Sequence, residues 1–270
     1  MILRRKRTLA ERADRHVLYQ QAVQDVEAEI DFVEQTWAEL RHRPARHLRE
    51  DFCGTANTAC EWVSRDPSHT AIGVDLDEDV LAWGEEHNLA ALSPEAQERI
   101  ELRRENVLDT RAAPVDIVLA MNFSYYLFTE REALRRYFRH VRAGLVEDGI
   151  FFLDAYGGYE APMVITEPRD CGEFTYIWDQ AAFNPIDSGM TCHIHFEFPD
   201  GSRLEEAFTY HWRLWTLPEI REVLLEAGFV QVDIYWEGTD EETGEGDGIF
   251  EPAEVGDADP GWICYIVAQR

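Results

Sequence analysis

Apolar positions near the start of the chain recur with the period of a helix. Residues 11 to 41 carry apolar side chains at spacings of three and four, which predicts one continuous helix with a single apolar stripe. The stripe is formed by Val26, Ile30, Val33, Trp37 and Leu40. We expect this leading helix to pack against the rest of the fold.

The pattern changes from about residue 46, where short apolar runs alternate with helical stretches. The runs lie at 70–75, 100–103, 115–121 and 149–155. Strands that alternate with helices predict β-α-β units and a mainly parallel sheet. Two Ser/Thr-x-x-Glu spacings, Thr129 with Glu132 and Thr216 with Glu219, predict helix starts closed by a capping box.

Strict alternation dominates from about 157 to 214, as in HIHFEF, with a turn at Asp200-Gly201. This predicts an antiparallel, hairpin-rich insertion. Two further strands are expected near the end of the chain, in VQVDIYW and WICYIVAQ. The acidic, glycine-rich stretch 238–261 between them is expected to be a surface loop.

Composition narrows the function classes. The chain has 270 residues and a formal net charge of -28, so it fits one domain with an insertion and repels polyanions such as nucleic acids. Its only clear basic run is Arg4, Arg5, Lys6 and Arg7, expected to be a solvated terminus. Five scattered cysteines argue against disulfides or structural zinc and favour a reducing compartment. With no signal peptide or membrane span apparent, we expect a soluble, cytoplasmic protein.

The first strand-to-helix turn, HLREDFCGTANTACEW, is the strongest candidate for a ligand site. Gly54 would let backbone amides approach a ligand at the carboxyl end of the strand. The second strand ends in Asp75, 21 residues later, where a carboxylate can hold the hydroxyls of an adenosine ribose. Together these two residues predict a nucleoside site.

Five segments resemble the successive motifs of the class I S-adenosylmethionine-dependent methyltransferases. They are EDFCGTA, GVDLD, ENVLD, DIVLAMNFSYY and GIFFLDAYGG, and they cover about residues 45–156. The resemblance implies an α/β, Rossmann-like fold with a seven-stranded sheet, mainly parallel, whose antiparallel last strand is inserted between its neighbours. It also implies an N-terminal helical lid over 1–44, a methyltransferase domain over 45–270 and a β-rich insertion at about 157–214.

Carried over residue by residue, the resemblance assigns cofactor contacts to the ends of the first four strands. These contacts are Glu50, Asp51, Cys53, Gly54, Thr55, Asp75, Leu76, Asn106, Val107 and Asn122. Asp75 would bind the ribose, Leu76 would pack on the adenine and Asn106 would accept from the adenine amino group. The turn departs from the family pattern because Phe52 and Ala56 replace its outer glycines. In small-molecule members a leading helix covers the cofactor, which makes Tyr19 a candidate contact.

Methyl transfer needs a general base only if the acceptor arrives protonated. The candidate bases are His193, His195, His211, Tyr125 and Tyr126. Asn122 and Tyr126 are the preferred catalytic residues, because they follow the fourth strand. Aromatic side chains of the insertion, with one arginine, are expected to wall a substrate pocket. They are Trp178, Phe183, Tyr210, Trp212, Arg213 and Trp215. No third ligand joins His193 and His195, so we expect no metal.

The sequence therefore predicts an S-adenosylmethionine-dependent methyltransferase that acts on a nitrogen or oxygen of a small molecule. Nucleic acid and membranes are not expected as partners, and the oligomeric state stays open. Two alternatives keep the fold: a protein or RNA methyltransferase, and a non-catalytic relative that only binds the cofactor. A dehydrogenase is disfavoured, because Phe52 stands where a dinucleotide turn needs its leading glycine.

Overall fold

The computed structural model describes residues 7–240, 243–244 and 246–270. Arg4, Arg5 and Lys6 of the basic run lie outside these residues. The chain divides into two compact units. The larger unit comprises Val26–Gly158 and Trp215–Arg270, and the smaller unit comprises the residues up to Asp25 together with Tyr159–Leu214. Among the helices of the described residues, none is both long and apolar enough to cross a membrane.

The larger unit is built on one eight-stranded sheet with the order β11-β10-β12-β5-β4-β1-β2-β3. The strands are β1 (His47–Asp51), β2 (Thr70–Asp75), β3 (Ile100–Arg104), β4 (Val115–Ala120), β5 (Leu145–Gly157), β10 (Gln231–Thr239), β11 (Gly246–Pro252) and β12 (Trp262–Gln269). The pairs from β3 to β5 are all parallel. The terminal strand β12 runs antiparallel between β5 and β10, which confirms the predicted insertion of the last strand.

The eighth strand corrects the prediction that residues 238–261 form only a surface loop. Strand β10 continues to Thr239, and β11 pairs with it in antiparallel register. The acidic sequence did not indicate a strand here, because only one large apolar residue, Phe250, packs on the rest of the unit. Phe250 lies 4.6 Å from the Tyr265 ring and 6.1 Å from the Phe32 ring, between ring centroids.

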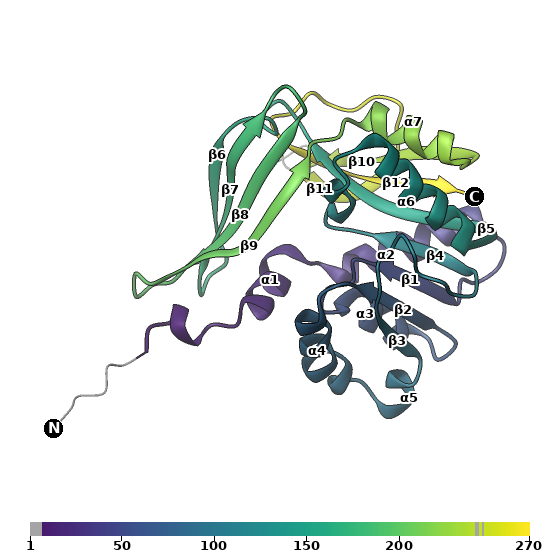
Figure 1. The fold of residues 1–270 in the computed structure, drawn as a ribbon, viewed down its shortest axis with the longest axis horizontal. Coiled ribbons are helices and arrows are strands. Elements are labelled where there is room, and N and C mark those ends of the chain that lie inside the picture. Colours follow the sequence, from purple (N-terminus) through teal and green to yellow (C-terminus); the bar gives the residue numbers. More distant parts are fainter. Residues whose placement is uncertain (1–6, 241–242, 245) are drawn as a thin grey trace. The chain divides into compact units, whose positions relative to one another are not determined.

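Helices cover both faces of this sheet (Figure 1). They are α2 (Val26–Leu40), α3 (Asn57–Arg65), α4 (Glu78–His87), the short α5 (Pro94–Gln97), α6 (Arg131–Gly144) and α7 (Leu217–Ala227). Helix α7 begins with the predicted capping box of Thr216 and Glu219. Helix α6 does not begin with the predicted one: its N-cap is Glu130, which makes no side-chain capping bond, and the Glu132 carboxylate pairs with Arg135 instead.

The predicted N-terminal helix is two helices. After a 3-10 turn, η1 (Ala10–Arg12), α1 (Arg15–Val23) begins at the cap Asp14 and ends at Gln24, whose backbone is extended. Helix α2 then packs on the large sheet through Ile30, Val33 and Trp37. The units thus separate between α1 and α2, whereas the sequence analysis placed the boundary at residue 44. The predicted stripe lies entirely on α2 and is confirmed, whereas the single continuous helix was the wrong prediction, because α1 and α2 pack on different cores.

The smaller unit confirms the antiparallel insertion. Its strands β6 (Ile165–Asp170), β7 (Thr175–Asn184), β8 (Gly189–Glu197) and β9 (Arg203–Arg213) form one antiparallel sheet in chain order. Helix α1 packs on one face of this sheet through Leu18 and Ala22. The residues that meet it there include Phe174, Ile194, Phe196, Phe198 and Ala207.

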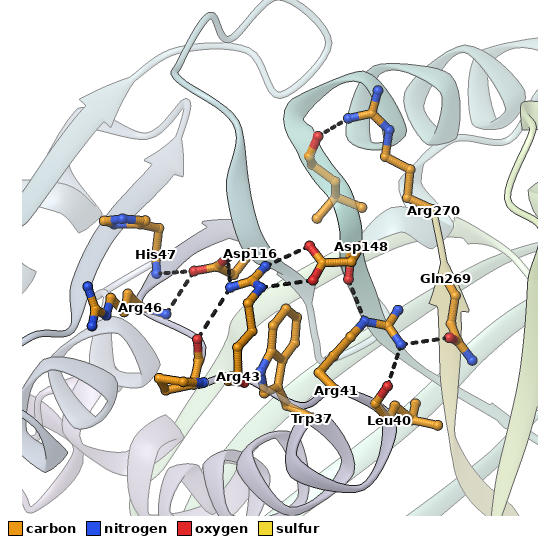
Figure 2. Close-up of polar contacts among 12 residues, drawn as sticks. Trp37, Leu40, Arg41, Arg43, Arg46, His47, Asp116, Asp148, Gln269 and Arg270 are labelled. Carbon is orange, nitrogen blue, oxygen red and sulfur yellow. Dashed lines mark hydrogen bonds and ion pairs between the residues drawn. The ribbon is translucent and has the colours of Figure 1, made fainter.

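A polar network fixes the end of α2 to the amino ends of the large sheet's strands (Figure 2). The Arg43 guanidinium pairs with Asp148 and with Asp116, each at 2.7 Å. Asp116 is 4% exposed, and its Oδ2 accepts from the backbone N–H groups of Arg46 and His47 at 2.8 and 2.9 Å. A buried carboxylate thus receives two consecutive backbone donors at the edge of the sheet opposite the strands' carboxyl ends.

Candidate functional site

The turn between β1 and α3 keeps a glycine-type backbone with only one glycine. Phe52, Gly54 and Ala56 all adopt left-handed conformations, with φ of 59°, 52° and 55°. The left-handed backbone conformation destabilises a residue that carries a Cβ by about 1–2 kcal/mol. Packing opposes that cost, since the Phe52 ring lies 5.5 Å from Tyr137 and 6.1 Å from Phe128, and Ala56 is fully buried. The turn therefore has left-handed backbone at all three positions of the glycine pattern, although Phe52 and Ala56 replace the outer glycines.

Gly54 is the open point of this turn. A Cβ built on it meets no atom within 4 Å, so its backbone faces space in which a ligand can approach closely. Its N–H donates to Asp75 Oδ2 at 2.9 Å. The other oxygen of Asp75 accepts from the Asp77 N–H at 2.9 Å. A carboxylate has about four acceptor positions, so both oxygens of Asp75 can accept further donors such as ribose hydroxyls.

Leu76, directly after Asp75, is 62% exposed. An exposed leucine beside a carboxylate at the end of β2 gives a flat base an apolar surface to pack on. Asp75 and Leu76 therefore fit the nucleoside part of the predicted cofactor, with the open backbone of Gly54 beside them.

Glu50 and Asp51 lie on opposite faces of β1. The Glu50 carboxylate accepts from the Ala59 N–H at 3.0 Å, in the first turn of α3. Burial raises the pKa of Glu50 to about 8, against the opposing effect of the bonds from Ala59 and the Thr58 hydroxyl. Glu50 thus anchors the start of α3, and it lies at the end of β1 beside the open turn.

Asp51 is 1% exposed and its partners are internal, which argues against the cofactor contact predicted for it. Its Oδ1 lies 2.9 Å from Arg49 Nε, and its Oδ2 accepts from Arg49 Nη2 at 3.0 Å and from the Tyr137 hydroxyl at 2.9 Å. Gly144 of α6 leaves room for this guanidinium, since a Cβ there would come within 2.6 Å of Arg49 Nη1. Asp51 therefore belongs to a buried ion pair that ties β1 to α6.

Cys53 and Thr55 flank Gly54 but turn inward. Cys53 is 2% exposed, with Sγ against Gly73 of β2, and burial raises the pKa of its thiol. Thr55 is 7% exposed, and its carbonyl accepts from Asn88 Nδ2 at 2.9 Å. Any contact that Cys53 makes with a ligand would therefore come through its backbone.

Asn106 and Val107 follow β3. Asn106 Oδ1 accepts from the Leu108 N–H at 2.9 Å, so this side chain shapes its own loop. A carbonyl oxygen has a second lone pair, which leaves room for the predicted bond from an adenine amino group. Val107 is 5% exposed. The assignment of both residues to the cofactor stays a prediction.

The loop after β4 is organised by an acidic residue that the sequence analysis missed. Asn122 and Phe123 are both left-handed, with φ of 58° and 56°, and their N–H groups donate to the two carboxylate oxygens of Asp154 at 2.7 and 2.8 Å. Asp154 lies on β5, is 7% exposed, and has its pKa raised to about 7 by burial, against the effect of these donors. Its signal in the sequence was a single acid inside the apolar run GIFFLDAY.

Tyr125 and Tyr126 lie in the 3-10 turn η3 (Ser124–Leu127) and are fully buried. The Tyr125 hydroxyl donates to the Asp154 carbonyl at 2.7 Å, and the Tyr126 hydroxyl donates to the Tyr156 carbonyl at 3.2 Å. Burial holds the pKa of both phenols well above 10. A buried phenol that donates to a carbonyl is a poor base, which argues against a general-base role for Tyr126.

The predicted residues of the smaller unit are described within that unit. The Tyr19 ring lies 4.9 Å from the Phe208 ring, on the face of the sheet that α1 covers. His193 and His211 bond to the threonine hydroxyls of Thr209 and Thr191. His195 Nδ1 accepts from the Glu206 N–H at 2.9 Å. Tyr19 and the histidines keep their proposed roles only as predictions.

The predicted aromatic wall is divided between the units. Trp178, Tyr210 and Trp212 pack on one another in the small sheet, with ring centroids 4.4–6.2 Å apart. Trp215 belongs to the larger unit, is 1% exposed and donates from Nε1 to the Phe128 carbonyl at 3.2 Å. Trp215 is therefore a core residue, which corrects its prediction as a pocket wall. Within the described ranges, His, Cys, Asp and Glu side chains form no cluster that could hold a metal.

Comparison with known proteins places this geometry in a fold class. The sequence matches no family model and no curated protein. It is structurally similar to an S-adenosylmethionine-dependent methyltransferase from Clostridium acetobutylicum, with a TM-score of 0.68 and 17% identity over 94% of this chain and 96% of that one.

Two further solved structures are similar over most of their length. One is an amino pentose methyltransferase from Micromonospora echinaspora, solved with S-adenosylmethionine bound (TM-score 0.65, 15% identity, 94% and 95% covered). The other is a sugar N-methyltransferase from a Streptoalloteichus species (TM-score 0.64, 16% identity, 100% and 97% covered). The chain thus has the Rossmann-like fold of class I methyltransferases, which confirms the fold that the sequence resemblance implied.

Proposed function

We propose that this protein is an S-adenosylmethionine-dependent methyltransferase that acts on a small molecule. The observation that carries the proposal is the pairing of Gly54 with Asp75: an open backbone in left-handed conformation, bonded at 2.9 Å to a carboxylate at the end of the next strand. The structural relatives support the cofactor, because one of them was solved with S-adenosylmethionine bound.

The residues present fit this cofactor. Asp75 would hold the ribose hydroxyls, Leu76 would pack on the adenine, and the Gly54 backbone would lie against the amino-acid part. S-adenosylmethionine supplies an activated methyl group on a sulfonium, so the protein has only to bind, orient and exclude water. When Glu50 is ionised, its carboxylate beside the open turn would attract the cationic end of the ligand.

We infer that the acceptor atom is a nitrogen, with oxygen as the alternative. The carboxyl ends of β1, β4 and β5 carry the partly exposed rings of Phe52, Phe123 and Tyr156. Aromatic faces near carboxylates favour a neutral or cationic acceptor such as an amine over an anion. The structural relative named as a sugar N-methyltransferase supports the same choice.

Titration calorimetry with S-adenosylmethionine and S-adenosylhomocysteine tests the cofactor assignment. We expect micromolar binding of both, and an absence of heat at millimolar ligand would contradict the proposal. Incubating cell extract with methyl-tritiated cofactor tests the acceptor class. Label in the low-molecular-mass filtrate supports a small acceptor, whereas label in protein or RNA would favour a macromolecular one. Binding without any transfer would favour a non-catalytic relative.

The five cysteines are free thiols, which supports a reducing compartment, and we propose the cytoplasm. Fractionation of cells with an antibody against the protein would test this location.

A further inference from the structure

We propose that Asp154 is a positioning residue for the acceptor side of the site, because it fixes the loop after β4 through two backbone hydrogen bonds. Both oxygens of its carboxylate are used, one by the Asn122 N–H at 2.7 Å and one by the Phe123 N–H at 2.8 Å. The proposal rests on the proposed function, since it assigns Asp154 to the strand edge where the transferred methyl group would lie.

The loop needs such a partner. Asn122 and Phe123 are consecutive left-handed residues, a conformation that an aromatic residue such as Phe123 rarely adopts, so the loop would relax if nothing held it. Successive N–H groups in this conformation point into one concavity that suits an anion. A carboxylate built into the neighbouring strand occupies that concavity and leaves the position of Asn122 fixed before any ligand binds.

The two hydrogen bonds from the Asn122 and Phe123 N–H groups depend on the ionisation of Asp154. A neutral carboxyl group carries a proton on one oxygen, and that oxygen then faces an N–H as a donor and loses the bond. Burial raises the pKa of Asp154 to about 7, so the change falls near neutral pH. The loop is thus expected to be held above this pH and loosened below it.

Other titratable groups around Asp154 do not account for such a change. From η3 the neighbours are Tyr125 and Tyr126, and from β12 they are Cys264 and the register partner Tyr265. Burial raises the pKa of Tyr125, Tyr126 and Cys264 well above neutrality. Glu50 on β1 also has a pKa raised to about 8 by burial, but β4 separates that strand from β5 and the Glu50 carboxylate accepts from Ala59 rather than from the loop after β4.

The matched pair of variants is Asp154→Asn and Asp116→Asn. Asp116 is also buried and also accepts from two consecutive backbone N–H groups, but at the amino edge of the sheet (Figure 2). The probes are S-adenosylhomocysteine and sinefungin, an analogue with an amine where the cofactor has its sulfonium methyl. Only sinefungin places a group at the position of the transferred methyl, so comparing the two affinities by calorimetry separates that position from the rest of the cofactor site.

We expect Asp154→Asn to weaken sinefungin about tenfold while S-adenosylhomocysteine binds within about twofold of wild type. Asp116→Asn should change neither affinity. An equal loss of both ligands, or no loss, in Asp154→Asn would overturn the positioning role. Failure of S-adenosylhomocysteine to bind the wild-type protein would instead overturn the proposed function.

A pH titration of the wild-type protein by amide NMR needs no variant. The Asn122 and Phe123 amide signals should shift together with a midpoint near pH 7, because both donate to one carboxylate. Signals that stay constant between pH 5 and 9, or that move with different midpoints, would contradict the proposal.

Discussion

A single methyl group added at Gly54 should separate ligand binding from folding. Gly54 has φ of 52°, and a Cβ built on it meets nothing within 4 Å. Gly54→Ala therefore costs only the left-handed strain of an alanine, about 1 kcal/mol of unfolding free energy. The same methyl group enters the space through which a ligand reaches the backbone. Overpacking of this kind costs about 1–3 kcal/mol, which corresponds to roughly 5–150-fold in affinity.

The matched control is Gly172→Ala, in the hairpin between β6 and β7. Gly172 has φ of 82° and also has nothing within 4 Å of an added Cβ, but it lies in the smaller unit. Urea unfolding should show a similar loss for both variants, and calorimetry with S-adenosylhomocysteine should show weakened binding only for Gly54→Ala. Wild-type affinity in Gly54→Ala would refute the argument that the backbone approaches the ligand there.

Three further predictions concern the turn and its surroundings. Ala56→Gly should leave the free energy of unfolding in urea unchanged or raise it by up to ~1 kcal/mol, because relief of left-handed strain offsets one lost buried methyl group. The control Ala59→Gly, inside α3, should lower it by at least ~1 kcal/mol. Equal losses in both variants would contradict the presence of strain at Ala56. Tyr137→Phe should cost about 1–3 kcal/mol by the same assay, since it removes a donor from the buried Asp51 carboxylate, and an unchanged value would contradict that bond. Burial raises the pKa of Glu50 from 4.5 to about 8, so its contribution to stability is fully present below pH 4.5 and is lost as the pH rises to 8, by up to ~1.4 kcal/mol per pH unit. Glu50→Gln should remove this loss, which melting temperatures measured from pH 5 to 9 would show. Parallel profiles of wild type and variant would refute the raised pKa.

The order of elements in the larger unit was predictable because its signals are local. Apolar runs of strand length alternate with amphipathic helices, and the capping box at Thr216 is complete within four residues. The eighth strand was not predictable from composition. Strand β11 pairs with its sequence neighbour β10, but its one aromatic ring packs on Phe32 and Tyr265 of other elements, contacts that a scan for apolar runs does not reveal.

The candidate site divides in the same way. Gly54 and Asp75 were found because spacing along the chain places both at strand ends. The two adjacent acids of β1 point to opposite faces of the sheet, and the sequence did not reveal that Asp51 would face α6 and pair with Arg49 and Tyr137. Asp154 was missed for a similar reason, since its role depends on backbone donors from a neighbouring strand's loop.

The buried pair of Arg49 and Asp51 also has a consequence for the alignment of β1 within the sheet. Leu48 is fully buried on the face that packs against α2 and α3. A slip of one residue would exchange the two faces, sending Leu48 toward α6 and placing the charges of Arg49 and Asp51 in an apolar layer without Tyr137. Because both charges lie on one face of the same strand, a slip moves them together and removes the Tyr137 hydroxyl bond and the room that Gly144 leaves for the guanidinium. Losing a hydrogen-bond donor to a buried charged group costs about 1–3 kcal/mol, which adds to the apolar contacts that disfavour the misaligned strand. The charged pair thus helps to fix the register of β1, the strand that ends in the candidate site.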